Sequence, residues 1–186
     1  MPPSLLAAAL APYPIVVPLA GRDWEIPALP AREWIRAVAR TDAEAAVMPG
    51  LLEPEDAERL MDRAMAGRVA SADLRRASYE AITQAAGRDW WQAVRLVGAA
   101  DDPLGRMYGE LTLRGVDAGA VSFAAWCAAV YTLLSRNLDA NKIAKLHAQL
   151  MLVPEGLSDD DLGDAPTDRE QIAALLKVMP EFRMSE

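Results

Sequence analysis

The sequence predicts a mainly α fold, with a helical domain of about six to seven helices, a short N-terminal β-hairpin arm and a linker-tethered C-terminal helix. Three observations predict it. At least six segments place apolar residues three and four positions apart and end at separate stop signals. Only two short runs favour strands, and 36 of the 186 residues are alanine, the strongest helix former.

The first 29 residues differ from the rest of the chain, because seven of the 13 prolines lie within residues 1–30. Two β-favouring runs, residues 15–19 and 24–29, flank a turn at residues 20–23. Pro18 and Pro27 each remove a backbone donor, so these strands lie at a sheet edge. We expect residues 1–29 to form an N-terminal arm.

The helical core domain is predicted over residues 30–153. Its first helix follows Pro30, and its second begins at Pro54 with one continuous apolar face. That face comprises Ala57, Leu60, Met61, Ala64 and Met65. A third helix is expected to be capped by Ser71 and to end at Gly87, with its inward positions at Leu74, Ala77, Ala81, Ile82 and Ala85.

A fourth helix is expected after Asp89, with Gly98 and residues 101–103 closing it, and residues 104–113 form a less regular segment. The clearest helix carries Phe123, Trp126, Cys127, Val130, Tyr131 and Leu134 at helical spacing. The next lies behind Asp139, with an apolar stripe of Ile143, Leu146, His147, Leu150 and Met151.

Residues 154–186 are predicted to be an acidic linker followed by a short helix. Pro154 and Gly156 mark the boundary, and residues 158–166 are rich in aspartate. Thr167 and Glu170 form a capping box for a helix with Ile172, Leu175, Leu176 and Met179. Limited proteolysis is expected to cut first between Ser158 and Thr167.

Charge argues against direct nucleic-acid binding. The formal net charge is -8, with nine acids and three bases in residues 155–186 and 18 acids and 16 bases before them. Such a chain lacks a basic surface for phosphates, and solvation of the acidic end is favoured over DNA mimicry. The first 20 residues contain no Lys or Arg and are interrupted by proline, so we expect neither a signal peptide nor a membrane span, and a cytosolic location.

No residue pattern predicts catalysis. The chain has one His and one Cys, and it contains none of the GxGxxG, Walker, GxSxG or HExxH motifs. We expect His147 to be a buried neutral imidazole and Cys127 a small buried apolar residue. The run Asp159–Asp161 lacks the ligand spacing of a calcium loop. The prediction is a non-enzymatic protein with no catalytic residue, cofactor or metal.

Trp90 and Trp91 are the most unusual local feature. Consecutive helical residues point about 100° apart, so one ring is expected in the core and the other at a seam or against a partner. Together with Met61, Met65 and Met151 they are the candidates for partner binding. All five side chains are also compatible with a purely structural place in the core.

Several stretches occur in an order that carries a family resemblance: the hairpin followed by residues 26–34, then residues 49–52, 86–96 and 113–117, and the helix with Trp126 and Tyr131. Together they cover about residues 13 to 135. In this order of features the chain resembles the tail assembly chaperones of long-tailed (siphovirus-type) phages of actinobacteria. None of these stretches is a catalytic signature.

The resemblance implies a helical factor that binds the tape measure protein and keeps it soluble while the tail tube assembles. Its implied partners are the tape measure protein, the tail tube protein and a longer form of the chain made by ribosomal frameshifting. It would act in the host cytoplasm and be absent from the mature virion. Two alternatives stay open: a virion structural protein, such as a head-tail connector or tail completion subunit, and a cellular regulatory module.

Overall fold

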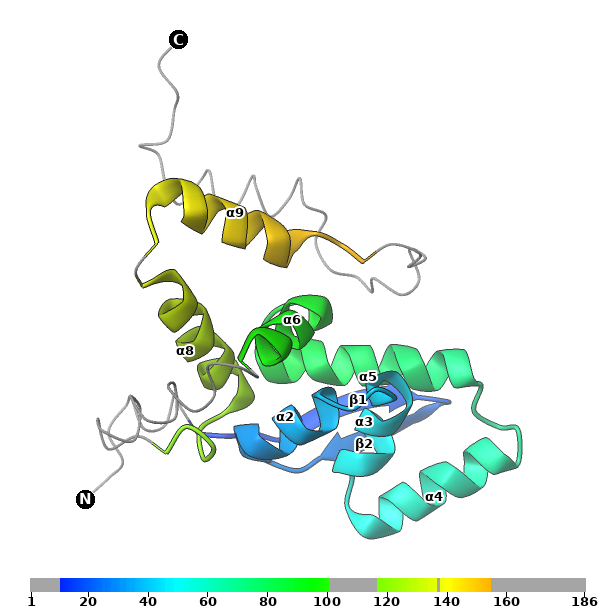
Figure 1. Ribbon diagram of the computed structural model, residues 1–186. Helices are drawn as coiled ribbons and strands as arrows, with labels where there is room; N and C mark the ends of the chain where they lie inside the picture. The colour runs from blue at the N-terminus through cyan, green and yellow to red at the C-terminus, as the bar shows by residue number, and fades with distance from the viewer. Residues whose placement is uncertain (1–10, 101–116, 137, 155–186) are drawn as a thin grey trace, which may run out of the picture. The chain divides into compact units, whose positions relative to one another are not determined.

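The computed structural model describes residues 11–100, 117–136 and 138–154. It confirms the predicted fold class, a mainly helical protein with a two-stranded antiparallel hairpin near its N-terminus (Figure 1). Residue contacts divide the chain into two units, Met1–Glu155 and Gly156–Glu186. The predicted acidic linker, the helix after Thr167 and the segment 104–113 lie outside the described residues.

The hairpin consists of β1 (Ile15–Leu19) and β2 (Arg22–Ile26), paired from Ile15 opposite Ile26 to Leu19 opposite Arg22. The second strand begins two residues earlier than predicted, because Ala20 and Gly21 alone make the turn. Both have positive φ angles, 53° and 75°, which is the backbone of a two-residue hairpin turn. Alternate residues of each strand point into the core, among them Val17 and Trp24.

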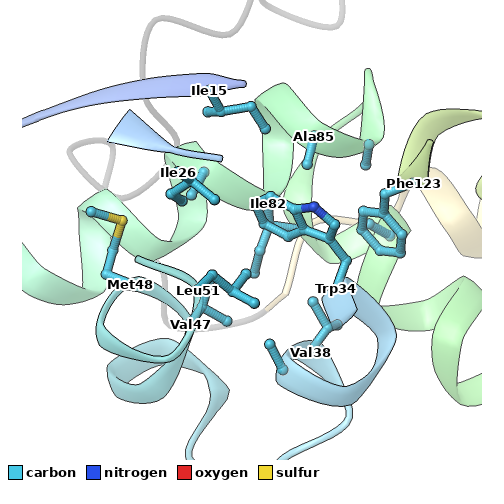
Figure 2. Packing of buried hydrophobic residues seen from close by; sticks show 14 of the residues in the cluster. Ile15, Ile26, Trp34, Val38, Val47, Met48, Leu51, Ile82, Ala85 and Phe123 are labelled. Carbon is cyan, nitrogen blue, oxygen red and sulfur yellow. The ribbon is translucent and has the colours of Figure 1, made fainter. Parts of the chain in front are cut away.

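Helix α5 (Ser71–Ala86) is the central element, because it packs against α3, β1, α6 and α8. Its buried positions include the predicted Ala77, Ala81, Ile82 and Ala85, and Figure 2 shows Ile82 and Ala85 among residues from the hairpin and from α2, α3 and α8. Gly87 ends the helix with a φ of 62°, as predicted. The predicted cap at Ser71 is wrong, since Ser71 is the first helical residue and Ala70 precedes it without a side-chain bond.

Helix α3 (Ala43–Leu51) was not expected from the sequence. Pro49 lies inside it, and proline normally argues against a helix interior. The helix nevertheless forms because Val47, Met48 and Leu51 are buried against α2 (Ala31–Val38), α4 (Pro54–Met65) and α5. Tertiary burial here outweighs local propensity.

Aromatic rings join α2 to α8 (Phe123–Ser135). The ring of Trp34 lies 5.9 Å from that of Phe123, which in turn lies 5.9 Å from Trp126, and Figure 2 shows the first pair. The backbone N–H of Ala31 donates to the carbonyl of Val121 at 2.8 Å. A first-turn donor of α2 is thus satisfied by the segment that leads into α8.

Helices α6 (Trp90–Ala100) and α9 (Ala140–Met151) complete the described part of the chain. Gly98 lies inside α6, which continues to Ala100, and residues 101–103, the other part of the predicted helix end, lie outside the described residues. Helix α9 begins after Asp139, as predicted, and the structure shows that Asp139 caps it: the carboxylate accepts the Lys142 N–H at 2.9 Å. That hydrogen bond lowers the pKa of Asp139.

Candidate partner-binding surfaces

The five predicted partner-binding residues do not form one surface. Met61 and Met65 lie on α4, which packs on α3. Trp90 and Trp91 form the first turn of α6, and Met151 is the last residue of α9, which packs on α6. The structure therefore separates a pair on α4 from a group around α6 and α9.

The pair on α4 is the more exposed. Met61 is 45% exposed and Met65 76%, whereas Leu60 is fully buried. The apolar face predicted for α4 is therefore not buried across its whole width, because Met61 and Met65 are exposed. Only Leu60 is fully covered, since α4 meets α3 along a narrow stripe and touches the hairpin through polar groups. We call Met61 and Met65, one helical turn apart, the α4 methionine pair.

Two polar contacts hold α4 to the hairpin. The guanidinium of Arg63 donates to the Ala20 carbonyl at 3.0 Å, and Arg22 pairs with Asp56 at 3.0 Å. Both contacts involve the side of α4 near the hairpin turn. The methionine pair is thus displayed on a helix whose position is fixed by other residues.

The two tryptophans have different environments. Trp91 is 6% exposed and belongs to the core. Trp90 is half-buried and stacks on Tyr79 of α5, with ring centroids 3.9 Å apart, and it meets Trp91 edge-on at 5.8 Å. Trp90 therefore covers the seam between α5 and α6, and neither ring projects freely into solvent.

Met151 lies in a pocket between α6, α8 and α9. The pocket has a volume of about 280 Å³ and is lined by Arg88, Gln92, Tyr131, His147, Leu150 and Met151. We call it the α6–α8–α9 pocket. Sequence reasoning missed Arg88 and Tyr131 as members, because three helices meet here that are far apart in the chain. The local sequence feature that could have drawn attention to Arg88 is its position, since it is a charged residue directly after Gly87, which ends α5.

Hydrogen bonds from α6 hold the end of α9. Arg95 donates to the carbonyls of Gln149 at 2.7 Å and Leu150 at 3.0 Å. Gln92 donates to the carboxylate of Asp89 at 2.7 Å, and its Nε2 lies 3.0 Å from the Met151 sulfur. The two Arg95 hydrogen bonds satisfy last-turn carbonyls that a helix end leaves open.

His147 corrects a sequence prediction. We expected it to be buried in the apolar stripe of its helix, but it is exposed and lines the α6–α8–α9 pocket. Leu150 is the only buried residue of α9, because this helix packs mainly on α6 and leaves most of its circumference to solvent. Periodicity identified the apolar side of α9 but not how little of it is covered.

Cys127 is buried as predicted. Its thiol is fully shielded within α8, and this burial raises its pKa to about 12, although the nearby Arg88 acts in the opposite direction. A thiol that holds its proton at neutral pH is a poor nucleophile. In the core cluster Cys127 serves as a small apolar side chain.

In the described ranges, no three His, Cys, Asp or Glu residues come together in a group that could hold a metal ion. The Asp159–Asp161 run lies outside those ranges. Within the same part of the chain, no helix has the length and apolar character needed to cross a membrane.

Comparison with known proteins adds no identification: no family model, curated protein or solved structure matches the chain. Functional inference therefore depends on the residues themselves and on the resemblance described above.

Proposed function

We propose that this chain is a non-enzymatic phage tail assembly chaperone that binds the tape measure protein and keeps it soluble while the tail tube assembles. The observation that carries the proposal is the α4 methionine pair, two large apolar side chains 45% and 76% exposed on a helix fixed by other contacts. The resemblance of residues 13 to 135 to tail assembly chaperones supplies the class of partner.

The physical argument concerns long helical partners. A tape measure protein exposes amphipathic helices before the tube encloses it, and those helices associate with one another unless their apolar faces are covered. Methionine suits such a task, since its unbranched and polarizable side chain adapts to different neighbours. Complete burial of a fully exposed methionine contributes about 1.5–3 kcal/mol, and each residue of the pair contributes less because it is already partly covered.

We also propose further partners for the chain and the compartment in which it acts. The tail tube protein and a frameshifted longer form of the chain are further protein partners, and nucleic acid and membrane are not partners. The chain acts in the host cytoplasm during assembly and is absent from finished particles. Neither a cofactor nor a catalytic residue is part of this function.

The test is co-expression with the long helical protein encoded just downstream. Wild-type chain should raise the soluble yield of that partner and co-purify with it. The double variant M61Q/M65Q should keep its thermal stability and weaken binding roughly 30-fold, which corresponds to about 2 kcal/mol of lost apolar burial. The matched control is V16T, which changes a similarly exposed apolar residue, Val16 at 47%, on β1.

Three results would contradict the proposal. Binding unchanged in M61Q/M65Q would remove the observation that carries the proposal, because the α4 methionine pair would then not contact the partner. A wild-type chain that neither binds nor solubilises the partner, but persists in purified particles, would identify a virion structural protein. A coding region without neighbouring capsid and tail genes would favour a cellular regulatory module.

A further inference from the structure

The α6–α8–α9 pocket has the opposite charge character from the chain as a whole. The protein carries a formal net charge of -8, yet the described residues that line the pocket include Arg88 and His147 and no acid. Leu150, Met151 and the ring of Tyr131 supply apolar surface beside them. A local basic and apolar lining in an acidic protein favours a ligand that combines negative charge with an apolar group.

Arg88 stands out because its charge has no partner within the described residues. It forms neither a hydrogen bond nor an ion pair there, and its Nε is buried without an acceptor. The adjacent carboxylate of Asp89 accepts a hydrogen bond from Gln92 instead. A half-buried guanidinium with an unsatisfied donor gains strongly from an incoming carboxylate.

Pocket size distinguishes between classes of ligand. A volume of about 280 Å³ lies just below the range of roughly 300–1,000 Å³ found for small-molecule and cofactor sites. One or two side chains of a partner fit such a pocket better than a cofactor. The opening between three helix surfaces also suits a helix laid across it.

We propose that the α6–α8–α9 pocket receives an acidic side chain of an amphipathic partner helix, with its carboxylate on Arg88 and a neighbouring apolar side chain against Leu150 and Met151. This inference rests on the proposed function for the source of the helix. It adds a second anchor to the α4 methionine pair and states what the partner must present: a glutamate or aspartate one turn from a leucine or methionine.

The experiment uses the single histidine as a reporter. Because His147 is the only histidine of the chain and lines the pocket, the full-length protein without a histidine tag gives one imidazole signal in NMR. The probes are two peptides of about 20 residues, long enough to be helical. One carries leucine and glutamate one turn apart, and the other replaces the glutamate by glutamine.

The glutamate peptide should shift the His147 signal saturably and bind about tenfold more tightly than the glutamine peptide, as a charge-assisted contact requires. R88Q should remove this preference. The control R75Q deletes the same charge from an exposed position of α5 and should bind like wild type. Added salt should weaken the glutamate peptide more than the glutamine peptide.

Equal binding of the two peptides, or no saturable shift with either, would overturn the inference without requiring any variant to fold. A glutamate preference retained in R88Q would also overturn it. These outcomes are independent of the proposed function, which is judged by solubilisation of the downstream protein and by the α4 variants. If co-expression succeeds and the peptides fail, the chaperone proposal stands and this pocket is not its anchor.

Discussion

The ring of Trp90 stacks on the ring of Tyr79 with centroids 3.9 Å apart and planes 3° from parallel. The same Tyr79 donates its hydroxyl hydrogen to the Glu44 carboxylate at 2.9 Å, so it links α6 to α3 across α5. A helix-starting tryptophan is thereby used to close a seam inside the chain. The Trp90 ring is thus packed within the chain, although Trp91 beside it occupies the core.

The first prediction separates the two tryptophans. W91A should lower the free energy of unfolding by roughly 3–5 kcal/mol, because it empties a buried site. W90A should lower it by about half as much.

A double-mutant cycle of W90A with Y79A should give a coupling free energy of about 1 kcal/mol from the ring contact. Urea denaturation measures wild type, W91A and the three variants of the cycle, and a coupling near zero would show that the stack contributes nothing.

Local signals identified several elements from the sequence alone, and each has a local physical cause. Gly87 and Asp139 end and begin helices because a left-handed residue and a capping carboxylate act within one turn. Helix α3 escaped prediction because Pro49 opposes it locally, and only contacts with distant elements stabilise it. Local patterns do not contain that information.

The candidate site shows the same division. Sequence periodicity placed Met61, Met65 and His147 on apolar helix faces. Whether each side chain is exposed depends on how much of that face a neighbouring helix covers. The α6–α8–α9 pocket depends on three helices meeting, so Arg88 could not be assigned to it from its own neighbours. The fraction of a helix face that its neighbours cover, and the meeting of helices that are distant in the chain, both depend on tertiary structure.

Cys127 provides a prediction on pH. Burial raises the pKa of its thiol to about 12, from an ordinary value of 9.0. Between those values the unfolded chain loses the thiol proton while the folded chain keeps it, so stability falls as pH rises, by about 1.4 kcal/mol per pH unit. Below pH 9 both states hold the proton and this contribution is constant.

The measurement compares wild type with C127A by urea denaturation from pH 7 to 11. The variant should lose the alkaline decline attributable to the thiol, while the contribution of Lys and Tyr residues remains in both proteins. A thiol reagent at pH 8 should modify wild type only after unfolding. Rapid modification of the folded protein would contradict the buried position of Cys127.

Ala20 provides a prediction on backbone strain. Its φ of 53° places a residue with a Cβ in the left-handed region at the hairpin turn. A20G should raise the free energy of unfolding by roughly 0.5–1 kcal/mol, because relief of that strain exceeds the added entropy of the unfolded chain. As a control, A28G changes an exposed alanine outside the turn and outside both strands, and it should not stabilise the protein. Thermal unfolding compares the two, and equal effects would show that the turn is unstrained.

The final prediction concerns Arg95, which joins α6 to the end of α9. Its two hydrogen bonds to the Gln149 and Leu150 carbonyls are charge-assisted, and α9 has only one buried residue of its own. R95Q should therefore weaken the attachment of α9 by about 1–3 kcal/mol and leave the rest of the fold intact.

Amide hydrogen exchange measures the loosening of α9 separately from that of the other helices. In R95Q the amides of α9 should exchange roughly 5-fold to 150-fold faster, since exchange follows the free energy of local opening. The amides of α5 should be unchanged, because their protection depends on the central core. R75Q removes the same charge from α5 and serves as the control.

Because Leu150 and Met151 line the α6–α8–α9 pocket, loosening α9 should also weaken binding of the glutamate peptide. Unchanged exchange of α9 in R95Q would show that Leu150 burial alone holds this helix in place.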